Sequence, residues 1–176
     1  DIMDAEVPVL KQLMDVYEDC EGSVLGVQEV PKDRVSSYGV VKPVAVKERL
    51  WRADDLVEKP SVEEAPSRLA VLGRYIISPE IFGILEKTEP GRGGEIQLTD
   101  ALKKLSEREP VYAYEFEGRR YDVGDKFGFM TTSINYGLTH PEVKDKLKDF
   151  IIALGKELSG ESENDATEAG TTVSVM

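Results

Sequence analysis

The chain has 176 residues, of which 40% are hydrophobic and 32% are charged, so it is long enough to bury the core of one globular domain. Its net charge of −12 at pH 7 and the lack of any apolar run near ~20 residues argue against binding to nucleic acid or to a membrane. One cysteine and one histidine, Cys20 and His140, exclude an internal disulfide and argue against a metal cluster or a catalytic triad built on them.

The first half of the chain predicts one helix followed by strands. Residues 6–20 carry an apolar face at helical spacing, formed by Leu10, Leu13, Met14 and Tyr17. Short apolar runs rich in β-branched residues then predict strands. The expected strands are 23–30, 38–41, a pair of extended segments within 44–57, and 69–77.

The second half predicts mainly helices. Ser78 and Pro79 resemble a helix start, with a capping side chain and a proline in the first turn, and Ile81, Phe82 and Leu85 form the apolar side. A glycine loop at 91–94 precedes a helix with an apolar face of Leu98, Ala101, Leu102 and Leu105. A strand at 111–116, a helix from 124 to 138 and a helix at 142–158 follow.

This alternation of strands and helices predicts an α/β fold with a mixed sheet in layers. We expect the folded domain to span residues 1–158. Residues 159–176 form an acidic segment with few large apolar side chains, so burial cannot offset its ordering entropy and we expect a disordered tail.

Four segments carry a family resemblance. They are LVEKP at 56–60, LGRYIISPEIF at 72–82, GGEIQLTDAL at 93–102 and FEGRRYDVGDKFGF at 116–129. In this order and spacing they resemble the C-terminal half of the bacterial UTP–glucose-1-phosphate uridylyltransferases, from about Asp1 to about Leu158. The resemblance implies the fold of the nucleotide-diphospho-sugar transferases, whose glycine-rich nucleotide-binding part would precede Asp1.

The resemblance also implies a reaction, in which UTP and glucose 1-phosphate give UDP-glucose and pyrophosphate. Two polyanions must meet, so such a protein needs cations, a metal ion on the phosphates and groups that read the sugar hydroxyls. The family implies Mg²⁺ as the cofactor, UTP, glucose 1-phosphate and UDP-glucose as ligands, a homodimer or homotetramer, and a cytoplasmic setting.

Glu58 and Lys59 are the first candidate site residues. They end an extended segment just before Pro60, a position that can hold a lysine at the rim of a cleft. By resemblance, Lys59 contacts the sugar phosphate as a catalytic residue, and Glu58 accepts hydrogen bonds from glucose hydroxyls. The simpler alternative is a solvated ion pair on a surface turn.

Asp122 is the second candidate, at a predicted strand end where α/β sheets bind ligands. A carboxylate there suits Mg²⁺, which takes one or two protein ligands besides phosphate oxygens. By resemblance Asp122 is a catalytic magnesium ligand, and Asp1 is the second metal ligand. The alternative is a helix cap, with Asp122 bonded to the amide of Gly124 or Asp125.

Glycines mark the expected sugar pocket. Gly39 and Gly73 interrupt predicted strands, where glycine often allows the close approach of a ligand or of another backbone. By resemblance both line the glucose pocket through main-chain groups, although steric packing explains them equally well. The GGEIQLTD segment, by resemblance, shapes the sugar side of the cleft, because its two carboxylates disfavour phosphate at that helix start.

Three other functions stay open. The chain could belong to another sugar-phosphate nucleotidylyltransferase, such as a thymidylyltransferase, because base selection depends largely on the other half of the family fold. It could be a non-catalytic module that binds sugar nucleotides. The apolar face of the last helix also allows a structural oligomerisation domain, although such a face more often packs on its own core.

Overall fold

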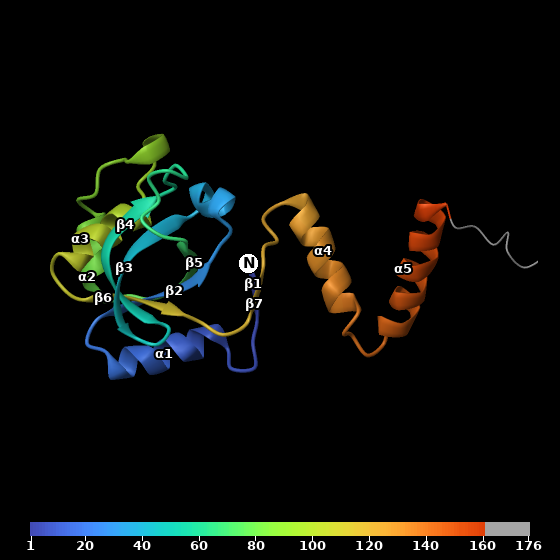
Figure 1. The fold of residues 1–176 in the computed structure, drawn as a ribbon. Coiled ribbons are helices and arrows are strands. Elements are labelled where there is room, and N and C mark those ends of the chain that lie inside the picture. Colours follow the sequence, from blue (N-terminus) through green and yellow to red (C-terminus); the bar gives the residue numbers. More distant parts are fainter. Residues whose placement is uncertain (161–176) are drawn as a thin grey trace, which may run out of the picture. The chain divides into compact units, whose positions relative to one another are not determined.

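The computed structural model describes residues 1–160, and its contacts divide them into two units. The barrel unit comprises Met3–Arg120. The helical unit comprises Asp1–Ile2 and the described chain from Tyr121 onward. Figure 1 follows the elements of both units along the chain.

Five strands of the barrel unit close into a barrel, in the order β2-β5-β3-β4-β6. They are β2 (Ser23–Glu29), β3 (Gly39–Lys47), β4 (Leu50–Glu58), β5 (Leu69–Ile76) and β6 (Val111–Glu115). The predicted mixed sheet is confirmed, since β2 runs parallel to β6 while the other pairs are antiparallel. Bulges in the β2–β5 and β3–β4 pairs add the local twist that a closing sheet requires.

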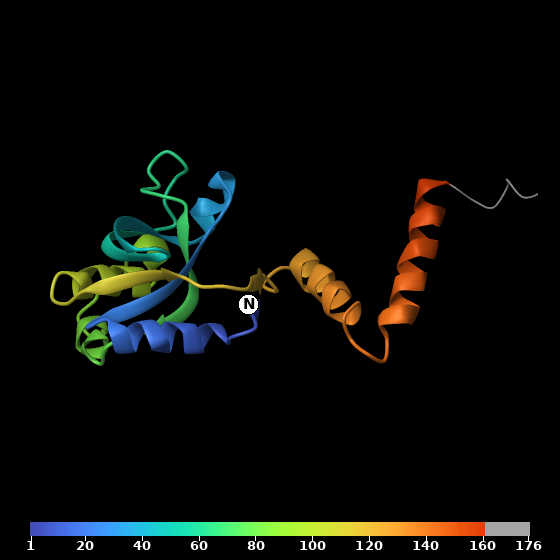
Figure 2. The ribbon, with the colours of Figure 1, turned by 60° about the horizontal axis from the view of Figure 1, so that its bottom comes forward.

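Helices cover the outside of this barrel (Figures 1 and 2). The helical segments are α1 (Val9–Asp19), η1 (Lys32–Ser37), α2 (Glu80–Leu85), η2 (Arg92–Gly94) and α3 (Leu98–Ser106). α1 packs on β2 and β5, whereas α3 packs on β4 and on α2. Three of the four residues predicted for the apolar face of α3 are confirmed as buried, namely Ala101, Leu102 and Leu105.

The apolar face predicted for α1 is wrong except at Leu13. Leu10, Met14 and Tyr17 are 47%, 45% and 40% exposed. The buried stripe is Val9, Leu13 and Val16, and it packs against β2 and β5. An eleven-residue helix with two overlapping apolar stripes can bury either one, and the sheet selects between them.

The start of α2 also differs from the prediction. Phe82 is 69% exposed, and Ile81 and Ile84 are the buried residues. Ser78 does not cap the helix, because Pro79 holds the N-cap position without a side-chain hydrogen bond. The Ser78 amide instead donates to the Ser23 hydroxyl at 3.0 Å, which ties the start of this segment to β2.

The helical unit contains α4 (Lys126–Gly137) and α5 (Lys144–Ser159). The Asp125 side chain caps α4 by accepting a 2.8 Å hydrogen bond from the Gly128 amide. The two helices meet where Leu147 lies against Gly137, since a Cβ at position 137 would collide with the leucine side chain. Elsewhere β1 (Ile2–Asp4) pairs with β7 (Arg119–Tyr121) as a two-stranded sheet.

The predicted last helix is present as α5, but within the described chain its apolar face does not pack on a core. None of its residues is buried, and Phe150 and Leu158 are 61% and 78% exposed. Among residues 1–160, no helix combines the length and the apolar character that a membrane span needs. The tail predicted at 159–176 lies outside the described residues from 161 onward.

Candidate sugar-phosphate site

Lys59 follows the last residue of β4 and has an unusual backbone. Its φ of 45° lies in the left-handed region, which is costly for a side chain with a Cβ, and Pro60 restricts it further. The Lys59 amide donates to the Tyr38 carbonyl at 3.0 Å, which extends the β3–β4 pairing by one bond. Backbone strain of this kind is most often retained at functional sites.

Glu58 lies beside this lysine and is mostly buried. Its side chain is 14% exposed, and its Oε1 lies 3.7 Å from Lys59 Nζ. Its Oε2 accepts a hydrogen bond of 2.6 Å from the Thr99 hydroxyl, at the start of α3. A buried carboxylate needs such partners, and here they come from the next residue and from a separate helix.

Gly39 completes the contact between these segments. It pairs with Glu58 across β3 and β4. A Cβ at position 39 would lie 2.9 Å from Thr99 Oγ1 and 3.1 Å from Glu58 Oε2, closer than ordinary contacts allow. The structure therefore brings Gly39, Glu58, Lys59 and Thr99 together.

Gly73 lies in β5 for a different reason. Its φ is 68°, and a Cβ there would meet no atom within 4 Å. The pairing with β2 is irregular at this point, so glycine supplies the left-handed residue of a bulge. No backbone of the described chain approaches it closely, and approach by a sugar stays a prediction.

Tyr75, two residues beyond this bulge, adds a phenol near Glu58. Burial raises the pKa of Tyr75, the negative charge of Glu58 raises it further, and a backbone hydrogen bond with Gly73 opposes both effects. The Tyr75 hydroxyl therefore stays protonated at neutral pH. Such a hydroxyl can donate a hydrogen bond to a ligand oxygen.

Asp122 follows β7 directly. Its Oδ1 accepts a 3.0 Å hydrogen bond from the Gly124 amide, as the helix-cap alternative proposed. That alternative is nevertheless wrong about the cap, because Asp125 holds the N-cap position of α4. Asp122 instead forms a local turn, and this bond orients its carboxylate.

Asp1 and Asp122 lie at the same end of the β1–β7 pair. A Cβ at Gly118 would lie 2.8 Å from the carbonyl oxygen of Asp4, so β7 begins where β1 ends and the strands run antiparallel. Asp1 immediately precedes β1, and Asp122 immediately follows β7. The antiparallel pairing thus places the two carboxylate residues predicted as metal ligands at one strand-pair end, within one unit.

Two carboxylates are enough for a magnesium ion that is shared with a substrate. Within residues 1–160 no cluster of three or more His, Cys, Asp or Glu side chains could hold a metal. Mg²⁺ does not need such a cluster, because it commonly takes one or two carboxylates, phosphate oxygens and water. Glu58 and Lys59 belong to the barrel unit, whereas Asp1 and Asp122 belong to the helical unit.

The glycine loop before α3 does not form an anion site. The Gly91 amide donates to the Glu95 carbonyl at 2.9 Å, and the Asp100 carboxylate lies against Gly91. A carboxylate in this position repels phosphate, as expected from the acidic residues of the segment. Its role on the sugar side of the cleft stays a prediction.

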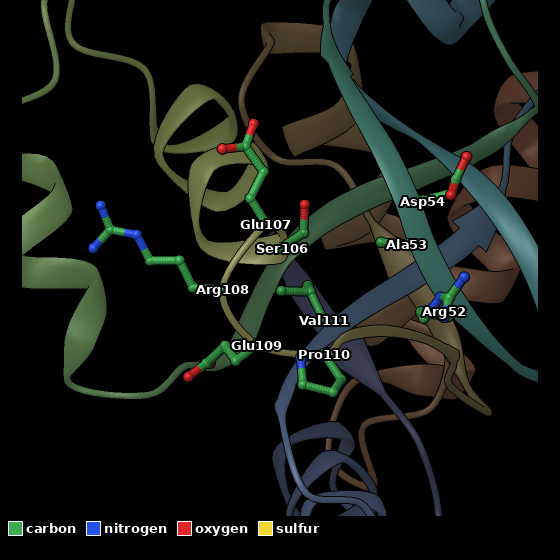
Figure 3. A pocket seen from close by; sticks show the side chains of 9 residues that line it. All are labelled: Arg52, Ala53, Asp54, Ser106, Glu107, Arg108, Glu109, Pro110 and Val111. Carbon is green, nitrogen blue, oxygen red and sulfur yellow. The ribbon is translucent and has the colours of Figure 1, made fainter.

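A hollow of about 340 Å³ lies at the other end of α3 and β4 (Figure 3). It is lined by Arg52, Ala53, Asp54, Ser106, Glu107, Arg108, Glu109, Pro110 and Val111. Its charged side chains carry both signs and point in different directions instead of converging (Figure 3). The group around Glu58 is therefore the better candidate site of the barrel unit.

Sequence reasoning placed Thr99 only within the segment that shapes the sugar side of the cleft, and it gave Tyr75 no role. Both lie in segments that carried the resemblance, so the signal was present in the sequence. Their roles depend on contacts with Glu58, which is 41 positions away from Thr99 along the chain. Only the folded structure shows that contact.

Comparison with known proteins identifies the chain's relatives. The family model described as "Nucleotidyl transferase" matches residues 7–137. A UTP–glucose-1-phosphate uridylyltransferase of Streptococcus pneumoniae serotype 4 is 56% identical over 161 residues, which are 90% of this chain and 54% of the relative. UTP–glucose-1-phosphate uridylyltransferase 1 of Streptococcus pyogenes serotype M1 is also 56% identical, over 86% of this chain and 50% of the relative.

Solved structures agree with these relatives. A UDP-glucose pyrophosphorylase complexed with UDP-glucose matches with a TM-score of 0.76 and 41% identity, over 78% of this chain and 53% of that one. A UTP-bound UGPase from Acinetobacter baumannii matches with a TM-score of 0.71 and 34% identity, over 81% and 49%. The resemblance noted in the sequence is confirmed, and the chain spans about half the length of the curated relatives it matches.

Proposed function

The chain belongs to the nucleotidyl transferase family, and on that premise we propose that it forms the sugar-phosphate-binding part of a UTP–glucose-1-phosphate uridylyltransferase. In that reaction a phosphate oxygen of glucose 1-phosphate attacks the α-phosphorus of UTP. The bond between that phosphorus and the bridging oxygen breaks, and pyrophosphate leaves with the electron pair. UDP-glucose is the other product.

The strained Lys59 beside the fixed Glu58 is the observation that carries this proposal. Lys59 keeps a left-handed conformation at a strand end, and such strain clusters at functional sites. Its side chain is 47% exposed, so its ammonium group can also contact a sugar phosphate. Glu58 keeps acceptor capacity for glucose hydroxyls, and Gly73 is open on its Cβ side. Gly39 and Gly73 would line the sugar pocket through main-chain groups.

Asp122 and Asp1 would hold the metal ion. Nucleotidyl transferases generally use a divalent metal, and we propose Mg²⁺ because the two residues offer only hard carboxylate oxygens. When bound, the ion neutralises phosphate charge and orients the phosphates for attack. The Gly124 amide holds Asp122 in one orientation for that purpose.

Uridylyl transfer is favoured over thymidylyl transfer by the relatives. The curated relatives at 54–56% identity carry the uridylyltransferase name. A putative glucose-1-phosphate thymidylyltransferase structure from Bacillus anthracis is only 22% identical, a likeness that concerns the fold alone. The homodimer or homotetramer and the cytoplasmic setting remain parts of this proposal, and a non-catalytic sugar-nucleotide module is the remaining alternative.

An activity assay tests the proposal. The chain is joined to the part of the Streptococcus pneumoniae relative that it does not match, and pyrophosphate release from UTP and glucose 1-phosphate is measured with Mg²⁺. We expect turnover by this fusion and little by the chain alone. Lys59→Ala should lower kcat/KM roughly 10- to 100-fold, because a charged hydrogen bond to phosphate contributes about 1.5–3 kcal/mol.

Two variants sharpen the assay. Asp122→Asn should raise the Mg²⁺ concentration for half-maximal activity by at least about tenfold. Lys47→Ala removes an exposed lysine of β3 that pairs with Asp19 at 3.9 Å, and it should leave kcat/KM unchanged. A folded fusion that stays inactive with UTP and glucose 1-phosphate, or a Lys59→Ala variant as active as Lys47→Ala, contradicts the proposed function.

A further inference from the structure

Glu58 is held in one orientation by a residue from outside its own strand. Thr99 donates to Glu58 Oε2 at 2.6 Å, a short bond of the kind made to an ionised acceptor. The opposite oxygen, Oε1, is the one that lies 3.7 Å from Lys59 Nζ. The two carboxylate oxygens therefore have different partners, and the hydrogen bond from Thr99 restricts the rotamer of Glu58.

The third member of this arrangement contributes by lacking a side chain. A Cβ at position 39 would lie 2.9 Å from Thr99 Oγ1 and 3.1 Å from Glu58 Oε2. This Cβ would crowd the donor and the acceptor of the hydrogen bond at once. To make room for it, the Thr99 hydroxyl or the Glu58 carboxylate would have to move and lengthen the bond. Gly39 is buried, and the hydrogen bond between Thr99 and Glu58 is part-buried.

We propose that Thr99 is a positioning residue that orients the Glu58 carboxylate toward the sugar of glucose 1-phosphate, and that Gly39 is required because a side chain there would break this hydrogen bond. The inference rests on the proposed function. The inference gives Gly39 the task of leaving room for the hydrogen bond. The close approach of the sugar can occur at Gly73, which is open on its Cβ side.

The physical benefit is preorganisation. A free glutamate side chain loses rotamer freedom when it binds a ligand, and a side chain already fixed by Thr99 does not lose it again. The bond also takes one acceptor oxygen out of competition, so the remaining lone pairs of Glu58 face the ligand in a defined direction. Loss of the hydrogen bond should lower the affinity for glucose 1-phosphate about tenfold, which corresponds to about 1.4 kcal/mol of binding free energy.

The test uses the 176-residue chain and glucose 1-phosphate, with binding measured by calorimetry and the Glu58 Cδ resonance by carbon NMR. Thr99→Ala should weaken binding about tenfold and shift the Glu58 resonance even without ligand. Thr99→Ser keeps the hydroxyl and should restore both. Thr139→Ala removes a threonine hydroxyl that donates to the Tyr136 carbonyl at 2.9 Å in the helical unit, and it should change neither.

Gly39 is tested in the same assays. Gly39→Ala should shift the Glu58 resonance and weaken binding as Thr99→Ala does. The Thr99→Ala and Gly39→Ala substitutions break the same bond, so their effects should not multiply. The double variant should lose less affinity for glucose 1-phosphate than the product of the two single losses. Multiplicative effects would show that Gly39 acts independently of Thr99.

The outcomes separate the inference from the proposed function. A folded wild-type chain that does not bind glucose 1-phosphate overturns the proposed function, whatever Thr99 does. An unmoved Glu58 resonance in Thr99→Ala, or binding that Thr99→Ser fails to restore, overturns the positioning role. Thermal unfolding of each variant identifies a general loss of structure, in which case Thr99→Ser, the smaller change, decides the question.

Discussion

Lys59 has a backbone conformation that glycine would adopt more readily, yet the chain carries a lysine there. The left-handed region costs a residue with a Cβ about 1–2 kcal/mol. The hydrogen bond from its amide to the Tyr38 carbonyl helps to hold it in place. Strained residues of this kind cluster at ligand-binding sites, so the strain at Lys59 is expected if its ammonium group binds a ligand.

Replacement of Lys59 by glycine should therefore separate stability from binding. Lys59→Gly relieves about 1–2 kcal/mol of strain and raises the entropy of the unfolded chain at a cost of about 0.5–1 kcal/mol, so its unfolding free energy should equal or exceed that of the wild type. Lys59→Ala keeps the strain and should be less stable than Lys59→Gly. Both should lose affinity for glucose 1-phosphate. Urea unfolding measures the stabilities. If Lys59→Gly is less stable than Lys59→Ala, the backbone of Lys59 is not strained.

Residue-level prediction from sequence worked where a short segment contains the whole signal. Glu58, Lys59 and Asp122 lie in quoted motifs, and the structure shows specific local geometry at each. Their functional roles stay predictions. The task of Thr99 could not be predicted, because it depends on a hydrogen bond between the start of α3 and the end of β4, which are distant in sequence.

Between elements, an ion pair joins α3 to β4. Lys103 Nζ lies 2.8 Å from Asp55 Oδ1, and the Leu56 amide donates to the same oxygen at 2.8 Å. Desolvation alone would raise the pKa of Asp55, but the hydrogen bonds from Lys103 and Leu56 hold the pKa below its usual value. This pair lies on the same two elements that carry Glu58 and Thr99.

The lowered pKa of Asp55 gives a defined dependence of stability on pH. A carboxyl group with a lower pKa in the folded state stabilises the protein above its unfolded pKa of about 3.9, and this contribution is lost as the pH falls through the folded pKa. Asp55→Asn should cost less than about 1 kcal/mol at pH 7, because solvent screens the pair.

The difference from the wild type should shrink below about pH 4, where the wild-type carboxyl becomes protonated. Urea unfolding at pH 7 and pH 3 measures it, and Asp33→Asn in η1 serves as the control. A destabilisation by Asp55→Asn that is as large at pH 3 as at pH 7 would show that the carboxylate charge is not the cause.

Helices differed in how much of their packing the sequence predicted. α3 carries a single apolar stripe, and Ala101, Leu102 and Leu105 are buried as expected. α1 carries two overlapping stripes, and periodicity alone favoured the one that is exposed. Which stripe is buried depends on how α1 packs on β2 and β5, and the helix sequence alone does not contain that contact.

At the scale of the whole molecule, the sequence predicted a mixed sheet but not its closure. Closure requires β2 to pair with β5 on one side and with β6 on the other, and the latter contact joins residues near 25 to residues near 113. Local patterns do not contain such pairings. The described chain also leaves Phe127, Phe129 and Phe150 exposed, and the oligomer expected from the resemblance, which stays a prediction, would be one way to cover them.

The most direct test of the account is to map glucose 1-phosphate on the isotope-labelled 176-residue chain by amide NMR. We predict ligand-dependent shifts centred on Gly39, Lys59, Gly73 and Thr99, with the shifts strongly reduced in Lys59→Ala. Shifts centred instead on the hollow lined by Arg52 and Arg108, or shifts that persist unchanged in Lys59→Ala, would contradict a sugar-phosphate site at the end of β4.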